Sequence, residues 1–411
     1  MISNSLPTNT SISSQKEDLP GITGLRGAFA IWVLLLHLCI GLMVGGAQIV
    51  EILPHWLVNF IDSGFWGVDG FFVLSGFILT HNYKNLFVGS FSKETYFRFL
   101  GQRLARFYPV HLLVLMIYVF LLLAGVKFAQ MDCVSPEPTP LDCKVTMMEL
   151  TVHPELCAAN QSVQANRCDR FSATGLVKQL TLVSSWKKDA ELTWNFPAWS
   201  MSSEWFAYLL FPLVMIFVAR LNSITSLIIF GIFSVGVMLF YLWVGGYAPR
   251  GLDPELGLYR ISGHFLLGCI LYKLSKYKKV MDLNWSMIGL VSTFLIVFFS
   301  RTLVSYFFPF LLGIIVVSSA QKGTVVAKFF SGRIAQWLGG ISYSLYMTQV
   351  LIFDILGLIF TDDEPQKMTG LEAFGAFIFM CVVSLTSAYL VSVLVENPCR
   401  RYLKNFTMAK T

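Results

Sequence analysis

The chain has 411 residues, of which 55% are hydrophobic and 13% are charged, and its formal net charge is +6. A soluble chain usually carries about 25% charged residues. The low charge, together with 36 Phe and 10 Trp, excludes a soluble enzyme, a disordered protein and a typical nucleic-acid binder. The composition therefore predicts a protein that lies among membrane lipids and has no nucleic-acid partner.

Apolar segments follow a polar N-terminal stretch, 1–20, which we expect to be disordered and cytoplasmic. A helix that crosses the bilayer needs about 20 mostly apolar residues. The sequence predicts an all-α, polytopic bundle of about ten transmembrane helices in one domain, 21–403, before a cytoplasmic tail, 404–411. The expected spans are 22–46, 64–82, 107–127, 203–220, 224–245, 258–274, 284–300, 303–320, 336–360 and 371–395.

The distribution of basic residues predicts the orientation of this bundle. With the N-terminus inside, most of the 30 Lys and Arg residues fall in segments on the cytoplasmic side. Short loops rich in Lys and Arg remain in the cytoplasm. We therefore expect both termini to be cytoplasmic and the chain to be a multi-pass protein of the cell (inner) membrane.

One long segment, 128–202, is expected on the outer side of the membrane. On the oxidising side, four closely spaced cysteines indicate two disulfides, for which three pairings are possible. The alternative is four free thiols. The spacing lacks the close cysteine pair of a zinc site, so we predict no metal. The four cysteines are Cys133, Cys143, Cys157 and Cys168.

Two polar residues of the first span are the first candidates for chemistry. A charge at the bilayer centre costs roughly 2.5–3.5 kcal/mol, so such residues indicate function. Arg26 and His37 lie on one helix face, about 16 Å apart along the axis. A neutral imidazole can take a proton from a hydroxyl near pH 7. The alternative is a histidine that bonds to a neighbouring helix.

The next candidates are an isolated acid and a pair of arginines. Asp69 stands in the apolar run GFWGVDGFFVLSGF and needs a His or Arg partner; the alternative is an acid in contact with water. An acid that bonds to an imidazole fixes its tautomer.

Arg103 and Arg106 share a helix face at the cytoplasmic surface, where they suit phosphate binding. The alternative is contact with lipid headgroups.

Three later spans carry polar residues at helical spacing. Glu204 lies four residues after Ser200, where it could orient a sugar hydroxyl; the alternative is a helix-capping pattern. Arg260 and His264 share a face of the sixth span. A polar face on an apolar helix indicates a cavity or a neighbouring helix. The ninth span has such a face, formed by Ser342, Tyr346 and Gln349.

Together these motifs resemble the acyltransferase-3 family of integral membrane O-acyltransferases over about residues 20–403. The chain departs from the usual family pattern at Gln349, where many members have His, and at Gln102, where the first of two arginines is usual. It resembles the stand-alone form, without an esterase-like C-terminal domain. The matching motifs are GLRGAFAIWVLLLH, GVDGFFVLSGF, R-x-x-R with Tyr108 and Pro109, W-S-x-S-x-E from Trp199, Arg260 with Phe265 and Gly268, S-Y-x-x-Y from Ser342, and E-x-P from Glu396.

The resemblance implies transfer of an acyl group, most often acetyl from acetyl-CoA, to a hydroxyl of a surface glycan or glycolipid such as O-antigen, capsule or exopolysaccharide. Acyl-CoA would be a co-substrate, with no permanently bound cofactor. His37, oriented by Asp69, would act as base or acyl relay. The other implied roles are phosphate binding by Arg26, Arg103 and Arg106, catalysis with Glu204, and acceptor binding by Ser200, Arg260, His264 and Tyr346.

A glycan or lipid transporter without acyl transfer is the competing interpretation. It would also need charges and a cavity within the membrane. Such transporters usually contain internal repeats and helices broken near the midplane. Neither feature is evident in the sequence, so we favour the acyltransferase.

Overall fold

The computed structural model describes residues 18–44, 53–84, 86–87, 92–126, 170–186, 193–244, 257–300, 303–360 and 370–408. Within these ranges the chain is helical and has no β-strand, which confirms the all-α prediction. The four cysteines of the predicted disulfides, Cys133, Cys143, Cys157 and Cys168, lie outside the described residues.

The helices of the first half are α1 (Pro20–Val44), α3 (His55–Asp62), α4 (Trp66–Tyr83), α5 (Lys93–Leu123), α8 (Ala173–Leu180), α9 (Ala198–Arg220) and α10 (Ile224–Val244). Those of the second half are α11 (Gly257–Leu274), α12 (Lys278–Met281), α13 (Trp285–Phe298), α14 (Phe308–Ala320), α15 (Val325–Phe330), α16 (Arg333–Phe360), α17 (Gly370–Val391) and α18 (Asn397–Met408). Short 3-10 helices precede α4 and α14, namely η1 (Ser63–Phe65) and η3 (Leu303–Phe307), and a π-helical segment, η4 (Ser392–Glu396), joins α17 to α18.

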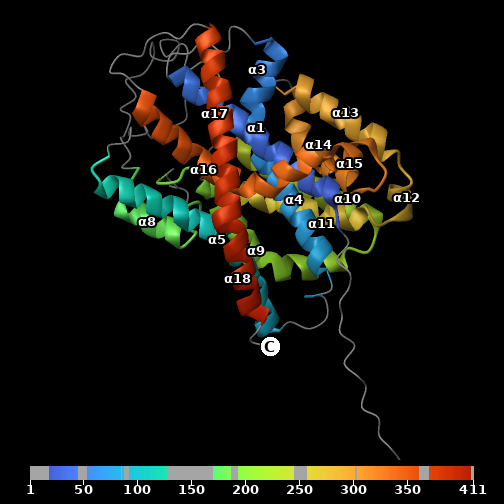
Figure 1. Cartoon of the computed structure of the whole chain (residues 1–411). Helices are drawn as coiled ribbons and strands as arrows, with labels where there is room; N and C mark the ends of the chain where they lie inside the picture. The colour runs from blue at the N-terminus through green and yellow to red at the C-terminus, as the bar shows by residue number, and fades with distance from the viewer. Residues whose placement is uncertain are drawn as a thin grey trace, which may run out of the picture.

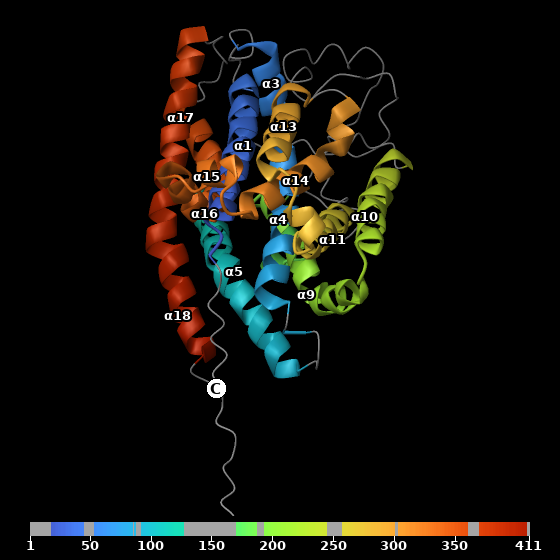
Figure 2. The same cartoon turned by 90° about the vertical axis from the view of Figure 1, so that its right-hand side faces the viewer.

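The long helices form a bundle with two distinct ends (Figures 1 and 2). One end carries α3 and the beginning of α17, and the other carries α18 and the beginning of α5. Helices α17 and α18 run as one long rod along the side of the bundle, whereas α1 lies inside it (Figure 2). Helix α1 therefore lies among other helices, which positions Arg26 and His37 in the interior.

Six helical segments are long and apolar enough to cross a membrane, and this confirms a helical membrane protein. Three shorter apolar helices accompany them in the described ranges. The count of ten spans and the cytoplasmic termini stay predictions. The six segments are Pro20–Ile40, His55–Tyr83, Lys93–Leu123, Ala198–Arg220, Arg333–Leu358 and Gly370–Leu403.

The third span begins at Lys93, well before its predicted start at residue 107. The hydroxyl of Ser92 accepts a hydrogen bond from the Thr95 amide and so caps the first turn. The basic segment before the apolar run therefore belongs to the same helix, and Pro109 lies inside it. This continuity joins Arg103 rigidly to the membrane-spanning part of α5.

Glycines bring α4 and α11 into close contact. A Cβ atom added at Gly76 would lie 2.0 Å from the carbonyl oxygen of Phe265, and one added at Gly268 would lie 2.0 Å from that of Val73. Small residues allow such approach between membrane helices, where packing rather than hydrophobicity drives association. The close approach determines which polar side chains of the two helices meet.

Candidate functional site

A fully buried ion pair joins α4 to α11. The guanidinium of Arg260 donates two hydrogen bonds to the Asp69 carboxylate, from Nη2 at 2.6 Å and from Nε at 3.1 Å. The Nδ1 atom of His264 lies 3.5 Å from the same carboxylate and donates to the Arg260 carbonyl oxygen at 2.8 Å. Arg260 also lies over the ring of Trp199. Asp69 is thus neutralised within the interior, as a buried charge requires.

The prediction that Asp69 orients His37 is wrong. Asp69 pairs with Arg260 and His264 instead, because α4 packs closely against α11. His37 is oriented by its own helix: its Nδ1 atom lies 3.0 Å from the carbonyl oxygen of Val33. A carbonyl only accepts, so Nδ1 carries the proton and the neutral ring has its lone pair on Nε2.

The Nε2 atom of His37 is buried and has no hydrogen-bond partner among the described residues. The ring of Phe196, which precedes α9, contacts the imidazole edge-on with centroids 5.6 Å apart. The side-chain amide of Gln349 on α16 is close enough to the ring for a hydrogen bond, although the geometry of Nε2 and of the Gln349 Oε1 atom does not form one. The imidazole is therefore held between α1, α16 and the beginning of α9, with its basic nitrogen uncommitted.

Glu204 and Ser200 occupy the first two turns of α9. The Glu204 carboxylate accepts hydrogen bonds from the hydroxyls of Ser75 on α4 and Tyr208 on α9. The Ser200 hydroxyl lies 2.8 Å from the Tyr346 hydroxyl of α16. Three of the predicted site residues thus line the faces where α4, α9 and α16 approach one another.

Arginines gather at the end of the bundle that carries α18. Arg103 is buried, donates from Nη2 to the Tyr83 hydroxyl at 2.7 Å, and lies over the rings of Tyr83 and Phe99. Arg26 interacts electrostatically with Arg106, Arg400, Glu204 and Glu396. Arg400 in turn interacts with Arg103 and Arg106. Four arginines and two glutamates therefore share this region, which leaves an excess of two positive charges.

Arg400 and Glu396 were not singled out as site residues in the sequence analysis. Their spacing of four residues places them on one face where η4 passes into α18. The Glu396 carboxylate accepts a hydrogen bond from the Ser344 hydroxyl of α16 at 2.6 Å. The signal in the sequence was the E-x-P motif, which marked Glu396 but did not indicate its neighbours.

Several of the polar groups described above interact electrostatically across the interior. Tyr346 interacts electrostatically with Arg260, Asp69 and Glu204, and Glu204 interacts with Arg26. We call this set of side chains the polar seam: Arg26, His37, Asp69, Arg103, Arg106, Ser200, Glu204, Arg260, His264, Tyr346, Gln349, Glu396 and Arg400. It connects the arginine-rich end to the region of His37. Among the described residues, no group of three His, Cys, Asp or Glu side chains could hold a metal.

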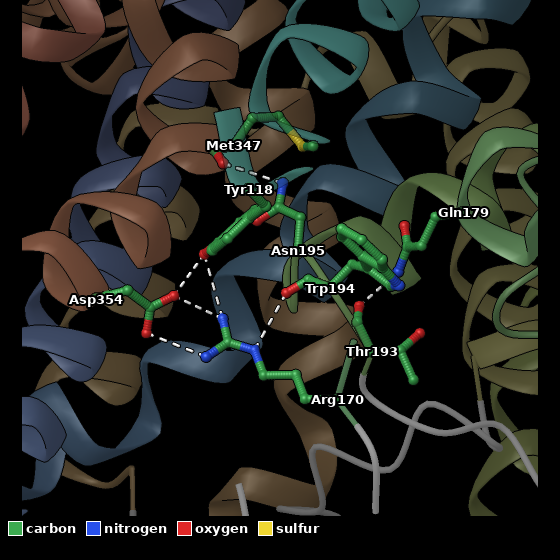
Figure 3. A network of polar contacts seen from close by, with 8 residues as sticks. All are labelled: Tyr118, Arg170, Gln179, Thr193, Trp194, Asn195, Met347 and Asp354. Carbon is green, nitrogen blue, oxygen red and sulfur yellow. Dashed lines mark hydrogen bonds and ion pairs between the residues drawn. The ribbon is translucent and has the colours of Figure 1, made fainter. Parts of the chain in front are cut away.

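A separate buried network, shown in Figure 3, gathers around Asp354, which follows Gln349 along α16. Arg170 donates to both carboxylate oxygens of Asp354 on α16, at 3.1 and 2.6 Å, and to the Trp194 carbonyl oxygen at 3.3 Å. The Tyr118 hydroxyl of α5 donates to the same carboxylate. Burial disfavours the Arg170 charge, but its bonds to Asp354 more than offset this and raise its pKa.

This network positions the backbone next to His37. The Asn195 side chain, adjacent to Trp194, donates from Nδ2 to the Met347 carbonyl oxygen at 3.2 Å (Figure 3). Because Phe196 follows directly, the network holds the aromatic ring that contacts the His37 imidazole. Sequence reasoning missed Arg170 and Asp354, since one lies outside the predicted spans and neither belongs to a recognised motif.

The fold and the site define the class of this protein: it is an all-helical membrane protein with a polar seam in its interior. The family model of the acyltransferase domain, acyltransferase-3, matches residues 19–393, and the chain belongs to this family. The sequence resemblance to that family is thereby confirmed. The site roles remain predictions.

Curated relatives include the O-acetyltransferase OatA of Staphylococcus aureus, which is 27% identical over 363 residues, covering 80% of this chain and 49% of OatA. The acyltransferase MdmB of Streptomyces mycarofaciens is 27% identical over 197 residues, covering 47% of this chain and 38% of MdmB. The chain thus spans about half the length or less of these relatives. No solved structure matches it at a significant level.

Proposed function

We propose that this protein is a membrane O-acyltransferase that moves an acyl group from cytoplasmic acyl-CoA to a hydroxyl of a cell-envelope glycan or glycolipid. The uncommitted Nε2 atom of His37, buried beside the polar seam, carries the proposal. Membership of the acyltransferase family supports it. A relative named as an O-acetyltransferase supports acetyl as the acyl group and acetyl-CoA as donor. The proposed location is the bacterial inner membrane, as a multi-pass protein.

The arginine-rich end suits the donor. CoA carries several phosphate charges, and guanidinium groups bind phosphate oxygens through paired, charge-assisted hydrogen bonds. Arg26 and Arg106 are half-buried and form no hydrogen bond among the described residues, and the region has an excess of positive charge. The thioester arm would then extend along the polar seam toward His37.

The chemistry follows from the tautomer of His37. Nε2 takes the proton of the acceptor hydroxyl while the hydroxyl oxygen attacks the thioester carbonyl carbon. The new C–O bond forms, the C–S bond breaks, and the CoA sulfur leaves with the proton from the imidazolium. In the relay variant, Nε2 itself attacks the carbonyl, the C–S bond breaks, and CoA leaves as a thiolate beside an acyl-imidazolium. The acceptor oxygen then takes the acyl group from Nε2, and the hydroxyl proton goes to the CoA thiolate. Both routes yield an ester and free CoA.

Unpartnered acceptors near His37 favour a substrate with several hydroxyls. The amide nitrogens of Asn195 and Gln349 donate to the carbonyls of Met347 and Tyr346. Their oxygens, Oδ1 and Oε1, are buried and without a partner among the described residues, as is Nε2 of His37. Three acceptors in one region call for a ligand that brings donors. A sugar supplies neighbouring hydroxyls, whereas a lone alcohol supplies one.

Replacing Gln349 with Met is expected to raise the KM for the glycan acceptor about two- to tenfold. The variant keeps the length of the side chain but removes the proposed bond from an acceptor hydroxyl to Oε1, worth about 0.5–1.5 kcal/mol. It also removes the bond from Nε2 to the Tyr346 carbonyl oxygen, a loss that Gln179→Met reproduces at Thr193. Steady-state kinetics with acceptor and donor varied separately would measure the effect, and the donor KM should not change. Gln179→Met is the control, because Gln179 is similarly buried and its amide nitrogen likewise donates to a backbone carbonyl, that of Thr193, but it belongs to α8, which provides none of the contacts to His37 described above. An equal shift in both variants would contradict acceptor binding by Gln349.

Replacing Arg106 with Gln is expected to weaken the apparent affinity for acyl-CoA at least tenfold. A hydrogen bond to a charged group contributes about 1.5–3 kcal/mol. Donor titrations at saturating acceptor would measure the change, with the acceptor KM expected to remain constant. The control is Arg98→Gln, which removes an exposed arginine of the same helix that pairs with Glu94. Unchanged donor affinity in the Arg106 variant would argue against the phosphate site.

Consumption of a CoA thioester by the purified full chain tests the function as a whole. The protein in lipid nanodiscs would receive acetyl-CoA and a candidate glycan, and thiol release and acylated glycan would be measured together. We expect both products to form in equal amounts. Glycan movement across vesicles without thiol release would instead support the transporter.

A further inference from the structure

A small pocket lies at the end of α4, between α11 and the turn that follows α14, with a volume of about 210 Å³. It is separate from the arginine cluster: Arg103 reaches Tyr83 from α5, whereas the pocket lies against α11 and α14. Its polar and aromatic lining includes His81, Tyr272, Ser275, Lys276, Gln321 and Lys322. None of the lining residues is a carboxylate. This pocket plays no part in the proposed transfer reaction.

Cations converge on one buried tyrosine in this pocket. Lys84 does not line the pocket itself, but its Nζ atom donates to the Tyr272 hydroxyl at 3.1 Å and lies 5.7 Å from the ring centroid. The Nζ atom of Lys276 lies 5.3 Å from the same centroid, and the His81 ring contacts it at 5.6 Å. Each cation–π contact stabilises by only about 0.5–1 kcal/mol at an exposed site. Two ammonium groups on one ring also repel each other, so an anion would stabilise the arrangement.

The hydrogen-bonding capacity of the pocket identifies the kind of anion. Lysine ammonium groups only donate, and the Tyr272 hydroxyl, which accepts from Lys84, still has its own proton to donate. A ligand rich in acceptors and negative charge matches these donors, as a phosphate group does. The volume of about 210 Å³ has room for a phosphate group with its hydration waters.

Ordinary surface lysines near this pocket provide a contrast. Lys278 and Lys279 belong to α12 and are exposed. Neither of them lines this pocket. Lys84 and Lys276 are also exposed, but both reach the ring of Tyr272, of which 4% is exposed. General attraction of basic residues to anionic lipid would not require this convergence.

We propose that this pocket binds a phosphate group, presented by an anionic phospholipid of the adjacent leaflet or by a soluble phosphate compound. The geometry assigns Lys84 and Lys276 as the charged ligands and Tyr272 as the neutral donor between them. The proposal is independent of the acyltransferase activity, because none of these residues belongs to the polar seam.

The test compares the full chain with Lys84→Gln/Lys276→Gln and with Lys278→Gln/Lys279→Gln, which removes the same charge from α12. Each protein is placed in phosphatidylcholine nanodiscs, with phosphatidylglycerol added in one arm and inorganic phosphate in the other. Binding is measured as the concentration-dependent rise of the unfolding temperature. We expect at least one probe to bind the original chain and the α12 variant, and the pocket variant to bind it at least tenfold more weakly.

The two arms distinguish the source of the phosphate. A difference confined to phosphatidylglycerol indicates a lipid headgroup, and a difference with inorganic phosphate indicates a soluble ligand. Equal weakening in both double variants, or no binding of either probe, would overturn the proposal. If the double pocket variant does not fold, the single exposed change Lys276→Gln takes its place. Acyl transfer by the pocket variant, measured separately, keeps this result distinct from the proposed function.

Discussion

Replacing His37 with alanine is expected to lower the turnover number for acyl transfer by about 10²- to 10⁴-fold. A positioned general base contributes acceleration of this order, and the relay route would lose its nucleophile altogether. The substitution removes both ring nitrogens, but only Nε2 is available to react, because Nδ1 bonds to the Val33 carbonyl oxygen of the same helix. Single-turnover kinetics with acetyl-CoA and acceptor would measure the loss directly.

The control for His37→Ala is His55→Ala, which removes an exposed histidine at the beginning of α3. Both variants should insert into the membrane and unfold at temperatures close to that of the original chain. Full turnover by a well-folded His37 variant would remove the imidazole from the mechanism. A loss that accompanies unfolding would instead be resolved with His37→Gln, which keeps a polar side chain of similar size without a basic nitrogen.

The helical membrane architecture could be predicted because it depends on composition and local pattern. Runs of about 20 apolar residues must satisfy their backbone hydrogen bonds internally, and only a helix does so within one segment. The shared face of Arg26 and His37 follows from helix geometry in the same way. The predicted span 107–127 marks only where the chain becomes apolar, whereas the cap at Ser92 determines where helix α5 begins.

The pairing of side chains between helices could not be read from the sequence. Asp69 required a basic partner, and His37, Arg260 and His264 were all chemically suitable. Which one it meets depends on the approach of Gly76 and Gly268 across the α4–α11 contact, a property of tertiary packing. For the same reason Arg400 and Arg170 were missed, since their partners lie on helices far away along the chain.

Replacing Asp69 with Asn is expected to destabilise the protein by about 3–5 kcal/mol. Removing one partner from a buried ion pair leaves an uncompensated charge in the interior, here on Arg260, of which 4% is exposed. Reversible unfolding in mixed detergent micelles would measure the change. The control is Glu94→Gln, which breaks the exposed pair with Arg98 and should change stability by only about 0.3–0.5 kcal/mol.

A double variant separates the charge effect from the loss of packing. Asp69→Leu combined with Arg260→Met removes both charges and keeps side chains of comparable size, so most of the stability lost in Asp69→Asn should return. If the double variant is as unstable as the single one, the uncompensated charge is not the cause. If stability returns but transfer does not, the pair also positions the polar seam, because Tyr346 interacts with both charged groups. Recovery of both properties would assign the pair to stability alone.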